Sequence, residues 1–324
     1  MRVSAEPAIV AAGPIAEPAQ SMLARFGTLA IAERDDPAVI RSLVSHAIAL
    51  IARGPTVIDE SLLEAAPELR VIGRTGVGVD GIDLGATTAR GIPVVVTPGC
   101  NEQAVAEGAI AMLISLAKRL PQLDQAVKNG EWMLRDTLGP SDVCGSVLAI
   151  AGFGRIGQRV AAMARALGIQ ILVCDPYADR DAVSAAGGEH VSLPEAVSRA
   201  DHLSLHVPLN AETDGLITTG LLTGAKPGLR LVNVSRGGLA PLDVLLSGLA
   251  SGALGGVAVD VFEEEPPRLD HPIFERNDVL CSPHAMALTP RSVYATMEAM
   301  ATGIVAVLEG RRPEHVANPD VYEQ

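Results

Sequence analysis

The stretch Val147-Leu-Ala-Ile-Ala-Gly152-Phe-Gly154-Arg-Ile-Gly157 decides the fold. An apolar run typical of a buried strand leads into three glycines with the spacing Gly-x-Gly-x-x-Gly, and a helical pattern follows over Gln158–Leu167. Gly152 permits a tight turn, Gly154 lets the backbone approach a pyrophosphate, and Gly157 lets the helix pack closely on the strand. The stretch therefore predicts a strand, a dinucleotide-binding turn and a helix.

The segments that follow the turn indicate which dinucleotide it binds. The N-terminus of the helix offers unpaired N–H groups to phosphates, and Arg155 and Ile156, which lead into the helix, are expected to contact the cofactor. Asp175 ends the next apolar run, near the offset at which a carboxylate meets the adenosine ribose hydroxyls. A carboxylate there repels a 2′-phosphate, so NAD is favoured over NADP, although the nearby Arg180 leaves NADP open.

The alternation of apolar runs with helical patterns extends in both directions from this stretch. It predicts an α/β protein with two parallel sheets covered by helices on both faces. The predicted strands are Ala8–Ala12, Leu29–Ala32, Ala47–Ala52, Leu69–Arg74, Val94–Val96, Val147–Ala151, Ile169–Cys174, His202–His206, Arg230–Val234, Gly256–Val261 and Val279–Ser282. Helices are predicted at Ala16–Arg25, Pro37–Ser45, Glu60–Ala66, Glu102–Leu120 (between an Asn101 N-cap and Pro121) and from Pro290 to Leu308.

The length of 324 residues favours two domains, which we expect at residues 1–100 plus 291–324 and at residues 101–290. Aromatic residues are only 2% of the chain, so aliphatic side chains must fill both cores. The net charge of −13 argues against nucleic acid or anionic membranes as partners. We find no signal peptide and no apolar run long enough to span a bilayer, and therefore expect a cytoplasmic protein.

The cysteines offer no sign of a metal site or of a disulfide framework. They stand far apart, without a Cys-x-x-Cys pair and without metal-ligand spacing to a histidine: Cys100, Cys144, Cys174 and Cys281. Free thiols in a reducing compartment are expected, and no metal.

Three later segments carry polar residues at the ends of predicted strands: Asn233–Gly238, Asp260–Pro267 and Cys281–His284. With the glycine turn, they resemble the D-2-hydroxyacid dehydrogenase family, especially its D-3-phosphoglycerate dehydrogenase branch. The resemblance extends from about Leu50 to Gly310 and includes 74–83, 90–94 and 101–107. It implies a flavodoxin-like substrate domain and a Rossmann NAD-binding domain, with the active site in the cleft between them.

The resemblance also implies a catalytic set that suits the chemistry. Oxidising a 2-hydroxy acid needs a base for the hydroxyl proton, and an imidazole titrates near neutral pH. His284 matches the family's catalytic histidine, and Glu265, which directly precedes Pro266, matches its carboxylate partner. Arg236 matches the arginine that holds the substrate carboxylate and polarises the C2 oxygen.

Further positions follow from the same resemblance. Asp260 matches the acid that bonds the nicotinamide carboxamide. His206 and Pro208 match the segment beside the adenine, where a purely structural role at a strand end remains open. Met286 stands where the family commonly has Gly or Ala, which leaves the pocket size open.

Five positions match substrate contacts. The backbone of Val77 and Gly78 would bind the substrate carboxylate, and Asn101 matches a substrate contact. Arg53 and Arg74 match basic residues near the substrate, as a distal anion requires. The resemblance thus favours oxidation of 3-phosphoglycerate to 3-phosphohydroxypyruvate. Reduction of hydroxypyruvate or glyoxylate, oxidation of another anionic acid such as sulfolactate, and an NAD-sensing role like that of related corepressors stay open.

Two expectations concern assembly and regulation. By resemblance, the long helix after Asn101 and the segment up to about Ser141 should help to form a homodimer. The sequence ends at Gln324, before the regulatory domain found in many phosphoglycerate dehydrogenases, so feedback by serine is not expected.

Overall fold

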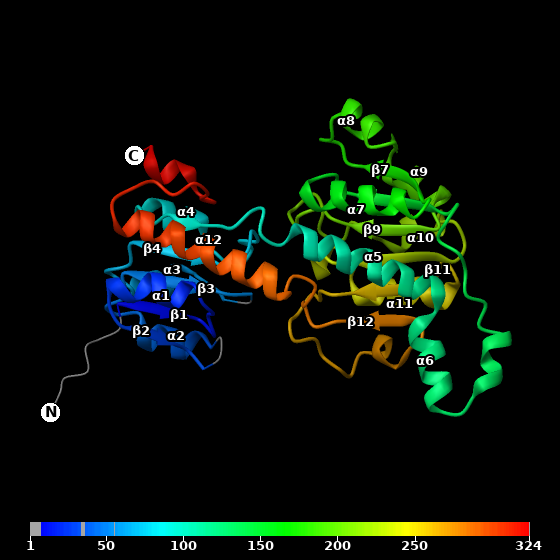
Figure 1. Ribbon diagram of the computed structural model, residues 1–324, viewed down its shortest axis with the longest axis horizontal. Helices are drawn as coiled ribbons and strands as arrows, with labels where there is room; N and C mark the ends of the chain where they lie inside the picture. Colours follow the sequence, from blue (N-terminus) through cyan, green and yellow to red (C-terminus); the bar gives the residue numbers. More distant parts are fainter. Residues whose placement is uncertain (1–7, 34–35, 55, 324) are drawn as a thin grey trace. The chain divides into compact units, whose positions relative to one another are not determined.

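The structure is a computed structural model, and it describes residues 8–33, 36–54 and 56–323. The described residues divide into two compact units, each built around its own parallel sheet (Figure 1). The first unit joins the residues up to Asn101 to those from Leu288 onward, and the second runs from Glu102 to Ala287. The predicted fold class, two α/β domains with parallel sheets, is confirmed.

The first unit has five parallel strands in the order β2-β1-β3-β4-β5. Successive residues of β1 face opposite sides of the sheet, as Ile9 and Val10 belong to different core clusters. Its strands are β1 (Ile9–Ala11), β2 (Leu29–Ile31), β3 (Ala49–Ala52), β4 (Val71–Arg74) and β5 (Val94–Val95). Its helices are α1 (Ala19–Leu23), α2 (Pro37–Leu43), α3 (Glu60–Glu64), α4 (Leu84–Ala89) and α12 (Pro290–Leu308).

The second unit has seven parallel strands in the order β12-β11-β10-β9-β6-β7-β8. Its strands are β6 (Val147–Ala151), β7 (Gln170–Cys174), β8 (Gly188–His190), β9 (His202–Leu205), β10 (Leu229–Asn233), β11 (Leu254–Val259) and β12 (Val279–Cys281). The strand order reverses between β6 and β9, and open sheets of this type bind ligands beyond the carboxyl ends of strands at such a point.

Helices cover both faces of this second sheet. On one face, α5 (Glu102–Lys118) and α7 (Arg155–Ala166) share a core with β6 and β7 (Figure 1). The other face carries α9 (Leu193–Arg199), α10 (Thr219–Thr223) and α11 (Leu242–Ser251). The short helix α8 (Arg180–Ala185) leads into β8, a strand that the sequence pattern did not reveal. In the part of the chain that the structure describes, no helix is both long and apolar enough to cross a membrane.

The predicted end of the long helix after Asn101 is wrong. Instead of running to Leu120 and stopping before Pro121, α5 ends at Lys118, and Arg119 adopts a left-handed conformation with φ 51°. Pro121 then lies in the first turn of a second helix, α6 (Leu120–Lys128). Proline is accepted there because the first N–H groups of a helix have no carbonyl partner in it. A 3-10 turn at Trp132–Asp136 follows.

Candidate active site

The glycine turn after β6 is shaped by close backbone contacts. Gly152 has φ 94°, and a Cβ built on it would lie 2.7 Å from the carbonyl of His206. A Cβ on Gly157 would lie 2.1 Å from the carbonyl oxygen of Gly152, so only glycine fits at both positions. A Cβ on Gly154, the N-cap of α7, would meet no atom of the described residues within 4 Å. Open space beside this helix N-terminus suits a phosphate group.

Asp175 follows β7 and is tied to the same turn. Its Oδ2 accepts a hydrogen bond from the N–H of Phe153 at 2.7 Å, and its Oδ1 accepts one from the N–H of Tyr177 at 2.9 Å. A carboxylate can accept about four hydrogen bonds, so both oxygens can still accept a ribose hydroxyl. Arg155 and Ile156 open α7 beside the turn, because the helix begins three residues before the predicted start at Gln158. The residues present therefore fit a dinucleotide.

The segment after β9 packs against the glycine turn. The imidazole Nε2 of His206 lies 2.8 Å from the hydroxyl of Ser204, and burial lowers the pKa of His206 to about 4. The imidazole ring is therefore neutral at pH 7. The backbone of His206 packs against Gly152. Pro208 is exposed, and its carbonyl accepts a hydrogen bond from the hydroxyl of Thr213 at 2.6 Å. These contacts give both residues a structural role, and a role beside the adenine stays a prediction.

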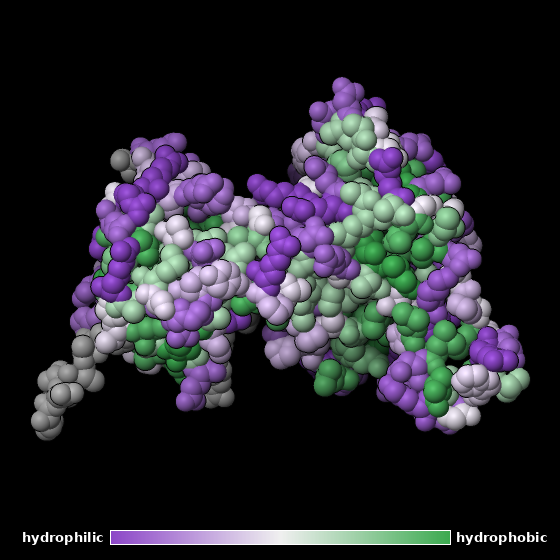
Figure 2. Space-filling model, in the orientation of Figure 1, coloured by the Kyte–Doolittle hydropathy of each residue, from purple (hydrophilic) through white to green (hydrophobic). Residues whose placement is uncertain are grey.

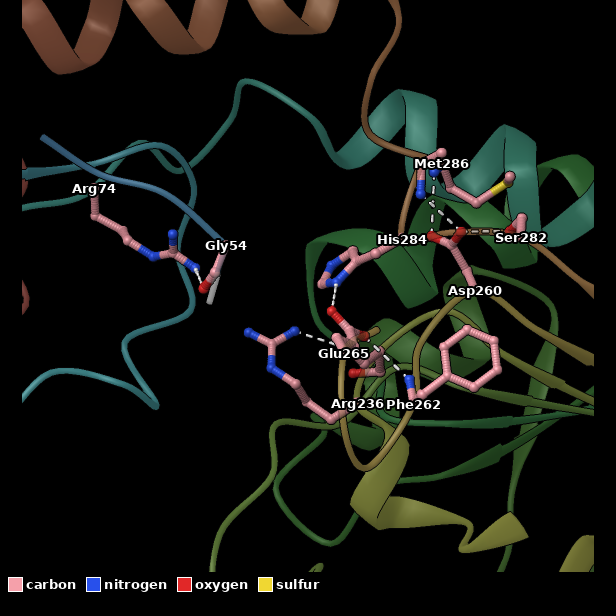
Figure 3. Close-up of polar contacts among 11 residues, drawn as sticks. Gly54, Arg74, Arg236, Asp260, Phe262, Glu265, Ser282, His284 and Met286 are labelled. Atoms are coloured by element: carbon pink, nitrogen blue, oxygen red, sulfur yellow. Dashed lines mark hydrogen bonds and ion pairs between the residues drawn. The ribbon is translucent and has the colours of Figure 1, made fainter. Parts of the chain in front are cut away.

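His284 and Glu265 form the central pair of the site (Figure 3). Nδ1 of His284 lies 2.7 Å from Oε2 of Glu265, and Oε1 of Glu265 accepts the N–H of Phe262 at 3.1 Å. His284 comes three residues after β12 and has a left-handed backbone with φ 51°. Its side chain is 44% exposed and that of Glu265 is 31% exposed, so the pair is accessible to a small molecule.

The charge state of Glu265 follows from its neighbours. Burial alone would raise its pKa, but the hydrogen bonds from His284 and from the N–H of Phe262, with the charges of His284 and Arg236, lower the pKa below its usual range. Glu265 is therefore ionised at neutral pH and accepts a proton-bearing Nδ1. The tautomer that this bond favours leaves Nε2 of His284 as the proton acceptor.

Arg236 reaches this pair from the turn after β10. Figure 3 shows its guanidinium near Glu265, and Nη1 donates to the carbonyl of Ser235 at 2.7 Å. A Cβ on the next residue, Gly237, would lie 2.0 Å from the carbonyl carbon of Phe262. The turn that carries Arg236 thus packs directly against the loop that carries Glu265. The three residues predicted to be catalytic lie together at the carboxyl ends of β10, β11 and β12.

Asp260, which directly follows β11, holds the loop around His284. It is 2% exposed. Its carboxylate accepts the hydroxyl of Ser282 and the N–H groups of Ala285 at 2.8 Å and Met286 at 3.1 Å, while its carbonyl accepts the N–H of His284 at 2.8 Å. Sequence reasoning assigned Asp260 to the nicotinamide and missed this anchoring, because the bonds join positions more than twenty residues apart.

The predicted substrate residues lie in the first unit, where Arg53, Arg74, Val77 and Gly78 stand at or just after the carboxyl ends of β3 and β4 and Asn101 follows β5. The guanidinium of Arg74 donates to the carbonyl of Gly54 at 3.2 Å (Figure 3). It also donates to the carbonyl of Gly78 at 2.7 Å. Arg53 donates to the carbonyl of Pro14. Val77 is 48% exposed. Asn101 is the last residue of this unit before the chain enters the second. Both arginines thus form hydrogen bonds with backbone carbonyls of loops, and their contact with a substrate stays a prediction.

Comparisons with known proteins agree with this geometry. Residues 110–286 match the family model described as D-isomer specific 2-hydroxyacid dehydrogenase, NAD binding domain. The chain is 36% identical, over 94% of its length, to an Arabidopsis thaliana protein named D-3-phosphoglycerate dehydrogenase 2, chloroplastic, and covers 49% of that protein. It spans about half the length of the first curated relatives that it matches.

Solved structures cover nearly the whole chain. A Thermus thermophilus protein has a TM-score of 0.88 and 30% identity, covering 95% of this chain and 99% of its own. The D-lactate dehydrogenase of Aquifex aeolicus, solved with NAD and lactic acid, has a TM-score of 0.85 and 28% identity, covering 93% and 95%.

Proposed function

The chain belongs to the D-isomer-specific 2-hydroxyacid dehydrogenase family, and we propose that it interconverts a small anionic 2-hydroxy acid and its 2-oxo acid with NAD. The observation that carries the proposal is the 2.7 Å hydrogen bond between His284 and Glu265, with Arg236 beside it. A base, its orienting carboxylate and a guanidinium are the groups that this reaction needs.

Each residue has a defined task in the proposed reaction. Nε2 of His284 takes the proton of the substrate hydroxyl, and Glu265 stabilises the positive charge that the ring then carries. Arg236 binds the substrate carboxylate and polarises the C2 oxygen, because its planar group can donate two parallel hydrogen bonds. The glycine turn and Asp175 would hold NAD, which when bound would accept the hydride from C2. In the reductive direction, His284 returns the proton.

We propose 3-phosphoglycerate as the substrate. The name of the Arabidopsis relative supports this choice, as do Arg53 and Arg74, whose charges suit a distal phosphate. Arg53→Ala should then raise KM for 3-phosphoglycerate much more than KM for glycerate, whereas equal effects would remove this argument. A hydroxypyruvate or glyoxylate reductase and a sulfolactate dehydrogenase are the alternatives within the same chemistry.

A single absorbance screen tests the proposed function. Purified protein is mixed with NAD or NADP and with 3-phosphoglycerate, D-glycerate, D-lactate or sulfolactate, and in the reverse direction with the reduced cofactors and the matching 2-oxo acids. We expect turnover with NAD to exceed turnover with NADP, and 3-phosphoglycerate to give the highest kcat/KM. Binding of NADH without turnover of any acid would contradict the proposal and favour an NAD-sensing role.

We also propose a homodimer that forms through α6 and the 3-10 turn after it. Val127 is 61% exposed, Trp132 is 59% exposed and Met133 is 67% exposed. Hydrophobic side chains are visible over the part of the surface that Figure 1 labels α6 (Figure 2). Apolar groups gathered in this way are typical of an interface. Sedimentation analysis should find a dimer for the native chain and a monomer for the Trp132→Glu/Met133→Glu variant, whereas a monomeric native chain would contradict the proposal.

A further inference from the structure

Asn233 is the last residue of β10 and is completely buried. We propose that it is a positioning residue that fixes the direction in which Arg236 presents its guanidinium, an inference that rests on the proposed function. An amide in the interior must find hydrogen-bond partners, because an unpaired polar group there is costly. The partners of Asn233 are therefore the best guide to its role.

Both side-chain bonds of Asn233 go to the turn that carries Arg236. Its Nδ2 donates to the carbonyl of Arg236 at 2.8 Å, and its Oδ1 accepts the N–H of Ser235 at 3.1 Å. The amide thus spans the turn and bonds both to Arg236 and to the residue before it. Such side-chain bonds fix the conformation of a turn that lies beyond the backbone hydrogen bonds of the sheet.

The position of the turn also sets the distance between Arg236 and its neighbours. The carbonyl of Asn233 accepts the N–H of Asp260 at 2.9 Å, which joins β10 to the strand whose loop leads to Glu265. On the other side, Gly237 packs so closely on the backbone of Phe262 that a Cβ would not fit. Asn233 therefore holds Arg236 between Asp260 and Phe262. Asp260 anchors the loop of His284, and the N–H of Phe262 holds Glu265.

The isosteric change Asn233→Asp tests this inference, because it keeps the acceptor for Ser235 and removes the donor to the carbonyl of Arg236. With the best acid from the substrate screen, we expect kcat/KM to fall about 10²-fold, as misplaced catalytic groups do. The Kd of NADH should stay within about twofold. Asn233→Ala is the companion variant in case the buried carboxylate prevents folding.

A double-variant comparison separates positioning from a general structural effect. If Asn233 acts through Arg236, the Asn233→Asp/Arg236→Ala variant should be no slower than Arg236→Ala alone. If the double variant instead lost the product of the two single-variant decreases in kcat/KM, the proposal would be overturned. Ser235→Ala is the matched control, since it removes a different bond of the same turn, from the Ser235 hydroxyl to the carbonyl of Val207 at 2.5 Å. It should lower kcat/KM less than about threefold by the same reasoning.

Crystal structures of native protein and the Asn233 variant provide a readout that does not depend on turnover. We expect the backbone at 235–237 and the guanidinium of Arg236 to be displaced in the variant. An unchanged Arg236 would overturn the positioning role even if activity fell. If the native protein turned over no acid, the proposed function would fail, whereas the position of Arg236 in the two crystal structures would still decide the positioning role.

Discussion

His284 directs Nδ1 at Oε2 of Glu265 over 2.7 Å, and the same carboxylate is held on its other oxygen by the N–H of Phe262. The carboxylate therefore cannot turn away from the ring without losing a backbone bond. This arrangement fixes both the orientation and the tautomer of the imidazole. Proton transfer in the proposed reaction depends on this pair and on the elements that hold it.

Glu265→Gln should lower kcat about 10²- to 10⁴-fold, because a neutral amide neither selects the tautomer with a free Nε2 nor stabilises the charged ring. Steady-state kinetics with the best acid measures the effect. Glu264→Gln is the matched control, since this neighbour is exposed, and it should behave like the native enzyme. Equal losses in the two variants would show that the carboxylate of Glu265 has no special role.

Asp175→Ser should change the cofactor preference. Without the carboxylate, the ribose hydroxyls lose an acceptor and a 2′-phosphate loses a source of repulsion. We expect KM for NAD to rise about tenfold and the ratio of kcat/KM for NAD to that for NADP to fall at least as much. Asp181→Asn, on the exposed face of α8, is the control. If the ratio of kcat/KM for NAD to that for NADP did not change in Asp175→Ser, the adenosine ribose would not bind at Asp175.

Gly108 and Met286 should be energetically coupled. A Cβ on Gly108 in α5 would lie 2.4 Å from the sulfur of Met286, so the methionine side chain occupies the space that this glycine leaves. In the Met286→Gly background, which removes the sulfur, Cγ and Cβ that lie nearest to this position, Gly108→Ala should stabilise the protein by about 0.5–1 kcal/mol, the usual gain for alanine in a helix. In the native background the clash should cancel this gain. Urea unfolding measures both, and equal effects in the two backgrounds would argue against the contact.

His202 should make stability depend on pH. It is 1% exposed, and burial, helped by the charge of Arg230, lowers its pKa from 6.5 to about 4. Below pH 6.5 the unfolded chain therefore binds a proton that the folded chain excludes, so stability falls as the pH decreases towards 4. At about pH 5 the loss is about 2 kcal/mol relative to neutral pH.

The variant His202→Gln checks this expectation, because glutamine does not titrate. Its free energy of unfolding should fall less between neutral pH and about pH 5 than that of the native protein, by about 2 kcal/mol. A His202→Gln variant with the native pH dependence would show that this histidine titrates normally in the folded state.

The parts of the fold that were predicted correctly depend on local signals. The strand, glycine turn and helix from Val147 onward follow from residues adjacent in the chain, and the structure has the strand at the predicted bounds. The break between α5 and α6 was missed because Arg119 carries no local sign of a left-handed conformation. The sequence pattern suggested instead that Pro121 followed the end of one helix.

The site shows the same division between local and distant information. Arg236, Glu265 and His284 could be predicted because each lies in a recognisable motif. The anchoring by Asp260 could not, because it depends on which turns meet once the strands stand side by side. The bonds of Asn233 span only two and three residues, and sequence reasoning missed them although they are local. A buried asparagine at the end of an apolar strand was the one available signal. The packing of Met286 on Gly108 likewise needed the fold, since the two positions are far apart in sequence.

The most direct test of the central claim is the kcat of His284→Asn with the best acid, at saturating NAD. Asparagine cannot take up the hydroxyl proton, and the residue keeps a backbone conformation that asparagine also adopts readily. We predict a fall of about 10²- to 10⁴-fold in kcat with unchanged affinity for NADH. A kcat within about twofold of the native value would show that His284 is not the base, and the proposed role of its pairing with Glu265 would be wrong.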